Sequence, residues 1–408
     1  MLPDHQPLPK LARFINYSGE RLLSEKKDPI LNRSANEVMQ NVADHLSLKD
    51  FGEPYFKAGL KLLLESINQD TNLTFLGKIL LRTAIDRNLE NRLKFIDLIK
   101  SQPEILSTQL NRPIIILGLP RSGTTFLHRL LAEDDSNRGL YLWELTHPIP
   151  SKGKEDHRKK IAKIEYNVFR QVSINMDHIH VIRNNVYEEC IWLLASTFHS
   201  SAFWAMAPVY SYLQWCLDND RLKSYEEYLQ FLKIFQLQTP SKRLLLKAPA
   251  HNGALTELRQ VLPNAIIVQT HRHPVEICNS TNSLIYWAHC NTSKQLDVKK
   301  TAESNIRLLH HATRRNMLAR KYHGVDVYDI WYKELLKEPI ETVKKLYASN
   351  NIKLSKKAEA NMKAFVNKNP QHKHGRHKYC ADDFGIHEIE IMAKFKDYMQ
   401  NFGYLQKQ

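Results

Sequence analysis

Residues 114–129, Ile-Ile-Ile-Leu-Gly-Leu-Pro-Arg-Ser-Gly-Thr-Thr-Phe-Leu-His-Arg, constrain the fold of this chain more than any other segment. A run of apolar residues ends at Gly118, a short loop with a second glycine and hydroxyl side chains follows, and a helical pattern then begins. This order predicts a strand, an anion-holding loop and a helix. Backbone N–H groups in such a loop form a concave anion site, and the positive end of the helix dipole faces that site.

The loop nearly matches the phosphate loop of nucleotide hydrolases. Gly118 and Gly123 occupy the two glycine positions, but Thr124 stands where that motif has its lysine. The lysine normally reaches the β- and γ-phosphates, so its absence argues against a nucleoside triphosphate. Arg121 supplies fixed positive charge, and Thr125 supplies a hydroxyl donor. The loop therefore favours a ligand with a short 5′ anion.

The composition is that of a soluble globular protein, with 43% hydrophobic and 25% charged residues in a chain of 408. The N-terminus shows no basic-plus-apolar signal, and no apolar run is long enough to span a bilayer. We therefore expect no membrane span and a cytoplasmic location.

The chain is strongly basic, because 58 lysine and arginine residues against 43 aspartate and glutamate residues give a net charge of +15. This excess suits an anionic cofactor or an acidic substrate. The basic residues are spread along the whole sequence, so the charge favours a generally basic surface over a nucleic-acid groove. The oligomeric state stays open.

Neither cysteines nor histidines indicate a metal site. The five cysteines are widely spaced and form no C-x-x-C pair, so we expect reduced thiols. The C-terminal histidines lack the companions of a usual ligand set; they are His372, His374 and His377. We predict that the protein holds no metal.

The periodicity of apolar residues divides the chain into two regions. Residues 1–109 read as helices, with three- and four-residue spacing over Leu46–Leu64 and Leu73–Ile99. Residues 110–408 read as an α/β region with a parallel sheet flanked by helices. Within it, residues 154–240 are mainly helical and rich in aromatic side chains, which predicts a helical cap over the site or plain packing.

Short apolar runs alternate with helical patterns in the second region. The runs that predict strands are Ile114–Leu117, Leu244–Leu246, Ile266–Gln269 and Val325–Ile330. The segments that predict helices are Phe126–Glu133, Leu255–Val261, Ala302–Lys321 and Ile340–Ser349. Ligands of open parallel sheets bind beyond the carboxyl ends of the strands, where this sequence presents Arg121, Lys247 and Arg272. Three cations at corresponding strand ends would neutralise a strongly anionic ligand.

These motifs together carry a family resemblance. The loop Pro120–Thr125, the Lys247-Ala-Pro segment, and Arg272 with Ser280 eight residues later occur in this order. The chain resembles the sulfotransferases that use 3′-phosphoadenosine 5′-phosphosulfate, and looks closest to a bacterial branch related to the tyrosylprotein sulfotransferases. A C-terminal His374-Gly-Arg-His segment is similar to a signature of that branch.

The resemblance implies a sulfuryl transfer from this donor to a hydroxyl or amine of a small-molecule or peptide acceptor. The donor-binding residues that it implies are Arg121, Ser122, Gly123, Thr124, Thr125, Arg272, Ser280 and Arg376. We expect Lys247 and Arg121 to stabilise the charge that develops on the leaving oxygen. Two other classes stay open: a nucleotide-dependent kinase, and a non-catalytic protein of the same fold that binds an anion or nucleic acid.

A hydroxyl attacks better when a base removes its proton, and two residues are candidates. Glu144 follows the phosphate-loop helix, as the base does in the tyrosylprotein relatives. His251 follows Lys247 by four residues, and histidine suits proton transfer near neutral pH. Glu188 and Glu189, in the predicted cap, could contact a cationic acceptor, but we expect them to lie on a solvated helix face.

Overall fold

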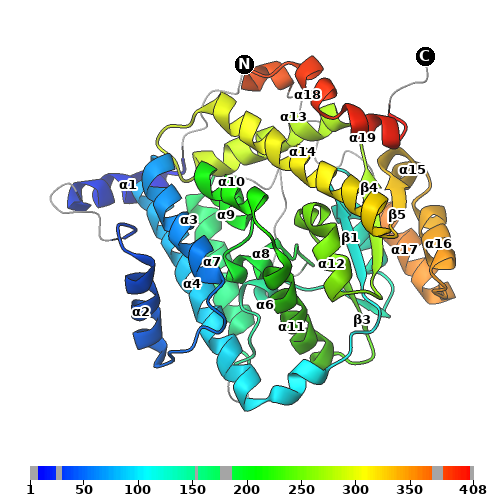
Figure 1. The fold of residues 1–408 in the computed structure, drawn as a ribbon, viewed down its shortest axis with the longest axis horizontal. Coiled ribbons are helices and arrows are strands. Elements are labelled where there is room, and N and C mark those ends of the chain that lie inside the picture. Colours follow the sequence, from blue (N-terminus) through cyan, green and yellow to red (C-terminus); the bar gives the residue numbers. More distant parts are fainter. Residues whose placement is uncertain (1–7, 24–29, 152–154, 175–185, 370–379, 405–408) are drawn as a thin grey trace.

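The fold is built on a five-stranded parallel sheet, seen in a computed structural model that describes residues 8–23, 30–151, 155–174, 186–369 and 380–404. The strands lie in the order β2-β3-β1-β4-β5 (Figure 1). They span Asn137–Arg138 (β2), Arg243–Lys247 (β3), Ile114–Gly118 (β1), Ile266–His271 (β4) and Tyr328–Trp331 (β5). The predicted parallel sheet is confirmed. Strand β2 was not predicted, because two residues are too few to show a periodicity.

Strand β1 is the central strand, and it is buried on both faces. Ile115 and Leu117 point into one apolar cluster, whereas Ile114 and Ile116 point into another. Burial on both sides explains why this strand reads as a continuous apolar run instead of an alternating one.

Helices cover both faces of the sheet. On one face lie the end of α4 (Phe75–Ser101), α11 (Leu222–Gln238) and α12 (Leu255–Val261). On the other face lie α5 (Thr124–Leu131), α16 (Pro339–Ser349) and α17 (Lys356–Lys368). This layered arrangement is the α/β architecture that the alternation of strand and helix patterns predicts.

The described part of the N-terminal region is mainly helical, as predicted. It contains α1 (Lys10–Leu23), α2 (Ala35–Leu46), α3 (Phe56–Asp70) and α4, followed by a short 3₁₀ turn at Pro103–Ser107. The expected helix over Leu46–Leu64 is wrong in its first half. Helix α2 ends at Leu46 because Ser47 is in the left-handed region (φ 55°), and α3 begins only after Pro54.

The segment between β2 and β3 is mainly helical, which confirms the prediction for the described part of residues 154–240. It contributes α6 (Leu142–Thr146), α7 (Arg158–Val172), α8 (Ile191–Leu194), α9 (Ala202–Met206), α10 (Tyr210–Asp218) and α11, with a 3₁₀ turn at Ala195–Thr197. Several of its aromatic side chains, including Phe198, Phe203 and Tyr212, are buried in one cluster with α2, α3 and α4. The N-terminal helices and this segment thus share a core.

The remaining helices and turns follow β3, β4 and β5 along the chain. It forms α13 (Pro274–Cys290), α14 (Val298–His323) and α15 (Tyr332–Lys337), a 3₁₀ turn at Pro249–Ala254, and another at Ala381–Phe384. Helices α18 (Glu388–Lys394) and α19 (Lys396–Asn401) lie beside α13 and α14 (Figure 1). All five cysteines are free thiols, and only Cys380 is exposed.

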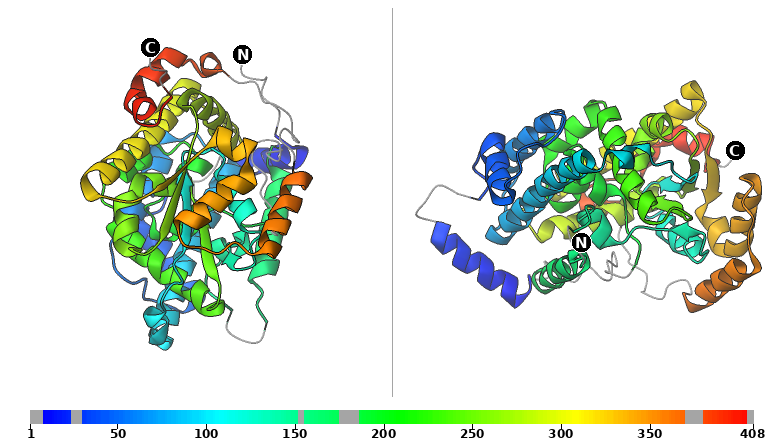
Figure 2. Two further views of the ribbon diagram at one scale, coloured as in Figure 1. Left: turned by 90° about the vertical axis from the view of Figure 1, so that its right-hand side faces the viewer. Right: turned by 90° about the horizontal axis from the view of Figure 1, so that it is seen from below.

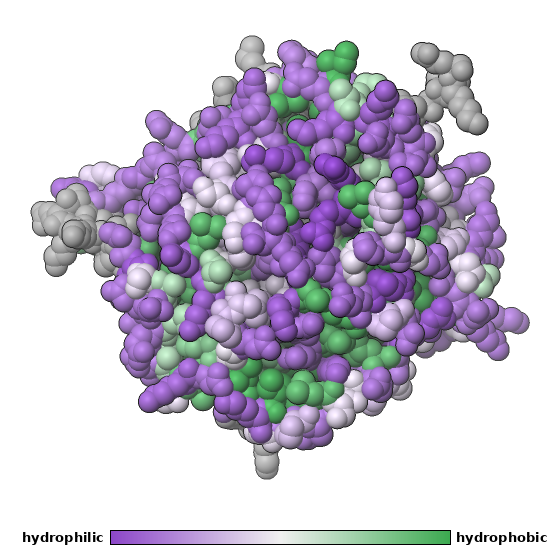
Figure 3. All heavy atoms as spheres, in the orientation of Figure 1, coloured by the Kyte–Doolittle hydropathy of each residue, from purple (hydrophilic) through white to green (hydrophobic). Residues whose placement is uncertain are grey.

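The surface is largely hydrophilic on the face that Figure 3 shows. No helix among the described residues is both long enough and apolar enough to cross a membrane.

Candidate active site

The phosphate-type loop follows β1 at the carboxyl edge of the sheet. Gly118 (φ 132°) and Gly123 (φ 98°) both adopt backbone conformations that favour glycine. A Cβ atom on Gly123 would lie 2.8 Å from the ring of Tyr332, so this position also requires a close approach. Helix α5 begins at Thr124, and the N–H groups of its first turn have no acceptor within the helix. The loop therefore directs backbone donors and the helix dipole to one point.

Arg121 and Arg272 lie together beside this loop. Nε of Arg121 donates to Oγ of Ser280 at 2.9 Å, and Nη1 of Arg272 donates to the backbone oxygen of Arg121 at 2.9 Å. Arg272 also stacks over the ring of Tyr332, 4.6 Å from its centroid, and pairs with Glu276 at 2.6 Å. Loss of hydration and the neighbouring Arg272 both lower the pKa of Arg121. Two adjacent arginines and the hydroxyl of Ser280 together suit a doubly charged phosphate.

Lys247 stands at the end of β3, on the other side of the loop. Its Nζ atom lies 2.6 Å from Oε1 of Glu189 and 3.4 Å from Oγ1 of Thr125. The lysine side chain is 1% exposed and the glutamate side chain 18% exposed. The structure thus brings Lys247 to the phosphate-type loop, as the sequence predicts, and adds a carboxylate.

Glu189 was missed as a site residue, and the prediction of a solvated helix face for Glu188 and Glu189 is wrong. Both lie in the short segment that precedes α8, where the backbone N–H of Glu188 donates to Leu140 O at 2.8 Å. Glu188 is buried, and burial raises its pKa to about 7, with Lys247 opposing the shift. The two adjacent carboxylates before a helix were the available signal, but only the fold shows that β3 brings a lysine to them.

Ser122 faces away from the site. Its hydroxyl donates to Leu119 O at 2.5 Å and bonds Oγ1 of Thr270 at 2.6 Å, and the residue is fully buried beneath the loop. Its side chain therefore holds the loop on β4. Arg376, the remaining predicted contact of the donor, lies outside the described residues, as do the three C-terminal histidines.

Glu144, the first candidate for the base, is buried in α6 and does not line the cavity described below. It pairs with Arg138, and its Oε2 atom accepts the N–H of Tyr141 at 2.9 Å. Two structural partners occupy this carboxylate, so the geometry gives it a role in capping the helix.

His251, the second candidate, is completely buried in the 3₁₀ turn after Lys247. Its Nδ1 atom bonds the hydroxyl of Tyr225 at 2.9 Å, and burial lowers its pKa to about 3. The neighbouring residues Pro249, Ala250 and Gly253 line the cavity, whereas His251 lies behind them. The structure does not bring it to the reacting position.

A cavity of about 2080 Å³ joins the loop, the strand ends and the surrounding helices. Its lining includes Arg121, Thr125, Glu189, Arg272 and Ser280 at one end. Apolar side chains of α4, α7 and α13 also line the cavity, among them Leu80, Ile164, Val168 and Leu284. Ligand pockets usually hold roughly 300–1,000 Å³, so this volume suits two ligands side by side.

The polar end of the cavity fits a donor with separate anionic groups. The α5 terminus and Lys247 can hold one anion, while Arg272, Arg121 and Ser280 can hold another. Among the described residues, no group of three or more His, Cys, Asp or Glu side chains is arranged to hold a metal ion.

Comparison with known proteins agrees with this geometry. Residues 113–356, more than half of the chain, match the model of the sulfotransferase family. The chain is 26% identical over 251 residues to omega-hydroxy-beta-dihydromenaquinone-9 sulfotransferase Stf3 of Mycobacterium bovis and of Mycobacterium tuberculosis. This match covers 58% of the chain and 61% of those relatives, so it spans less than two thirds of their length.

Two solved structures share the fold. Sulfotransferase STF1 of Mycobacterium tuberculosis superposes with a TM-score of 0.78 at 28% identity, covering 89% of this chain and 98% of that one. Sulfotransferase STF9 of Mycobacterium avium gives a TM-score of 0.82 at 23% identity, covering 92% and 98%. The family match, which includes the loop, Lys247, Arg272 and Ser280, identifies the chain as a member of the sulfotransferase family.

Proposed function

We propose that this protein transfers a sulfuryl group from 3′-phosphoadenosine 5′-phosphosulfate to a hydroxyl or amine, and that a hydroxyl on a largely apolar molecule is its preferred acceptor. One observation carries the proposal. The lining of a single cavity combines Arg121, Arg272, Ser280 and Glu189, the ion-pair partner of Lys247, with apolar side chains of α4, α7 and α13.

The donor site follows from the charges and hydroxyls around the loop. The backbone N–H groups of Gly123, Thr124 and Thr125 would hold the 5′-phosphosulfate at the start of α5. Arg272 and Ser280 would hold the 3′-phosphate, with Arg121 between the two anions. The ion pair of Arg272 with Glu276 would open as the phosphate takes the place of the carboxylate.

The donor supplies an activated sulfuryl group, whose bond to the phosphate oxygen breaks as the bond to the acceptor oxygen or nitrogen forms. Lys247 would stabilise the negative charge that develops on the departing phosphate oxygen. Glu189 would accept the proton of the attacking hydroxyl, since it lines the cavity and contacts Lys247. This assignment replaces Glu144 and His251, whose side chains are buried elsewhere.

The apolar side chains of the cavity indicate the class of the acceptor. Apolar side chains of α4, α7 and α13 form a wall of the cavity that Glu189, the partner of Lys247, also lines. The mycobacterial relatives are named as sulfotransferases of an omega-hydroxylated dihydromenaquinone, an apolar molecule that carries a hydroxyl group. A terminal hydroxyl would reach the pair while its apolar part occupies the wall.

Binding of labelled 3′-phosphoadenosine 5′-phosphosulfate tests the proposal. We expect saturable binding, followed by transfer of label to an apolar alcohol. Absence of saturable binding, together with binding of adenosine triphosphate and magnesium, would favour a kinase. A salt-dependent DNA shift without donor binding would favour a non-catalytic nucleic-acid-binding protein.

A further inference from the structure

Helix α7 presents apolar side chains to solvent. Ile161, Ile164 and Val168 follow helical spacing along one face, and Ile164 and Val168 are 55% and 53% exposed. Helix α1 behaves in the same way, with Phe14 66% and Leu22 76% exposed. Clusters of exposed large apolar residues usually mark an interaction surface.

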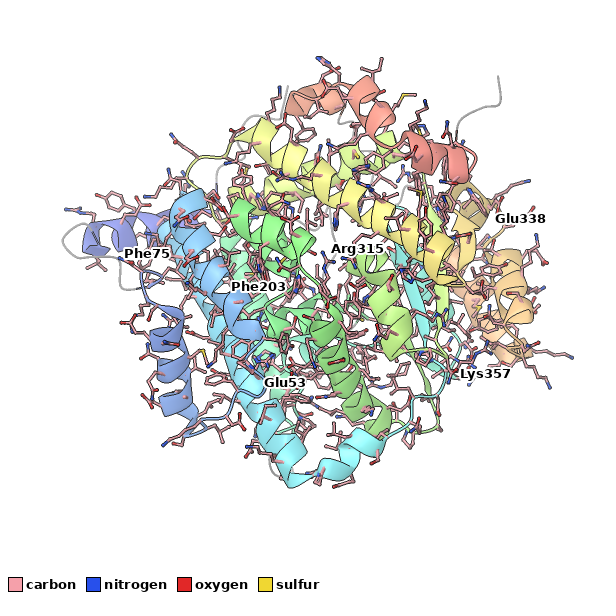
Figure 4. All side chains as sticks on the ribbon, in the orientation of Figure 1. Glu53, Phe75, Phe203, Arg315, Glu338 and Lys357 are labelled. Carbon is pink, nitrogen blue, oxygen red and sulfur yellow. The ribbon has the colours of Figure 1, made fainter. Side chains whose placement is uncertain are left out.

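One face of α1 packs against the start of α4, and this packing fixes the position of the helix. Ala12 is completely buried, and the side chain of Asn16 accepts the N–H of Leu76 at 2.8 Å. A Cβ atom on Gly19 would collide with the ring of Phe75, labelled in Figure 4, so the helix packs closely against the start of α4. The apolar residues of its other face therefore point outward because the helix is docked.

The two helices are neighbours, and their exposed apolar side chains are grouped as one surface. Helix α1 contacts α7, and the right-hand view of Figure 2 shows one end of α1 next to α7. Val172 of α7 is buried with Ala12 and Leu76. We call this surface, made by Leu11, Phe14, Leu22, Ile161, Ile164 and Val168, the α1–α7 face.

Lysine and arginine side chains surround the α1–α7 face. Helix α7 carries five lysine or arginine residues and one glutamate, and α1 carries three and one. Lys159, Lys160 and Lys163 are all exposed. An apolar strip flanked by lysines is the pattern of helices that lie in the interface of a bilayer with anionic lipids.

The cavity adjoins this face. Ile164 and Val168 line the cavity and are at the same time more than half exposed, and Ile79 of α4 lines the cavity while 37% exposed. The same cavity is lined by Glu189, which pairs with Lys247 at 2.6 Å.

We propose that the α1–α7 face docks on the surface of an anionic bilayer, so that an apolar acceptor passes from the bilayer into the cavity. The exposed apolar side chains insert among the lipids, and the lysines pair with their headgroups. Only the identity of the entering molecule rests on the proposed sulfuryl transfer, because docking itself requires no chemistry.

Sedimentation with vesicles tests the proposal. We expect the wild-type protein to bind vesicles of phosphatidylglycerol and phosphatidylcholine, and to bind pure phosphatidylcholine far less. The double variant F14E/I161E should lose at least about tenfold in partition coefficient, because neither residue can then insert. The variant K159Q/K160Q should lose about fivefold for each lysine, and high salt should mimic it.

Matched variants on other surfaces provide the controls. I389E changes an isoleucine that is 75% exposed on α18, and K57Q/K61Q removes two exposed lysines of α3. Both should bind vesicles like wild type. Equal binding by F14E/I161E and I389E would overturn the proposal. A wild-type dimer in sedimentation velocity that F14E/I161E dissociates, without vesicle binding, would instead assign the face to a second copy of the chain.

Turnover separates this inference from the proposed function. A short water-soluble alcohol should be sulfated equally by wild type and F14E/I161E, since Phe14 and Ile161 do not line the cavity. A long alcohol embedded in vesicles should be sulfated several-fold more slowly by the variant. Vesicle binding without sulfation of either alcohol would contradict the proposed function and leave the docking face intact.

Discussion

The ammonium group of Lys247 lies 2.6 Å from the carboxylate of Glu189, at the point where β3 ends and the cavity begins. The pair joins a residue of the sheet to a residue of the segment between β2 and β3. It also lies beside Thr125, in the first turn of α5. We therefore expect the two side chains to act together in the transfer, one on the leaving oxygen and one on the acceptor hydroxyl.

Glu189→Gln should lower turnover by roughly 10²–10⁴-fold, because the glutamine keeps the shape of the side chain and loses its basicity. The affinity for adenosine 3′,5′-bisphosphate should change little. Steady-state kinetics and calorimetry check both values. Glu144→Gln is the matched control, since that carboxylate pairs with Arg138: it should lower the free energy of unfolding and spare turnover. The reverse result would restore Glu144 as the base.

Lys247→Met should lower turnover by about 10²–10³-fold with a much smaller change in donor affinity, because its charge acts where charge develops in the transition state. The single variant should also lose stability, since Glu189 remains without its ion-pair partner. The double variant K247M/E189Q should recover stability without recovering turnover. Wild-type turnover in K247M would remove Lys247 from the mechanism.

Arg272→Ala should weaken the binding of adenosine 3′,5′-bisphosphate by about 10- to 150-fold, the range for lost hydrogen bonds to a charged group. Glu276→Gln provides the comparison, since it removes the carboxylate that pairs with Arg272 at 2.6 Å. That variant should bind the ligand at least as tightly as wild type. Equal affinity in wild type and R272A, measured by calorimetry, would reject the assignment of the 3′-phosphate.

Glu188 predicts a pH dependence of stability. Burial raises the pKa of its carboxyl from 4.5 to about 7, so between these pH values the folded protein holds a proton that the unfolded chain releases. The free energy of unfolding is therefore highest at low pH with respect to this group. It falls as the pH rises towards 7, by about 3 kcal/mol in total. Denaturant unfolding at pH 5–8 should show this loss in wild type relative to E188Q. A difference that does not vary with pH would contradict the burial of an ionisable group there.

Local patterns predicted most of the sheet and the donor end of the site. The strand at Ile114–Gly118 is a buried parallel strand with an apolar run. Lys247 ends β3 and Arg272 directly follows β4, so their convergence could be inferred. The register, which aligns Ile116 with Lys247 and Gly118 with Thr270, confirms that they meet at one edge.

The base could not be inferred in the same way, because it comes from a segment whose path over the sheet the sequence does not reveal. Glu144 looked suitable from its distance after the loop, but Arg138 and the N–H of Tyr141 occupy its carboxylate. His251 follows Lys247 closely, yet the 3₁₀ turn directs it into the core. The domain boundary near residue 109 and the cytoplasmic location stay predictions.

Transfer of radiolabel in a single turnover tests the central claim most directly. The protein, preloaded with labelled 3′-phosphoadenosine 5′-phosphosulfate, is mixed with a long-chain primary alcohol, and the products are separated. We predict one labelled sulfate ester and one adenosine 3′,5′-bisphosphate per active site, and almost none of either with K247M. Tight donor binding without transfer to any alcohol, phenol or amine would contradict the account.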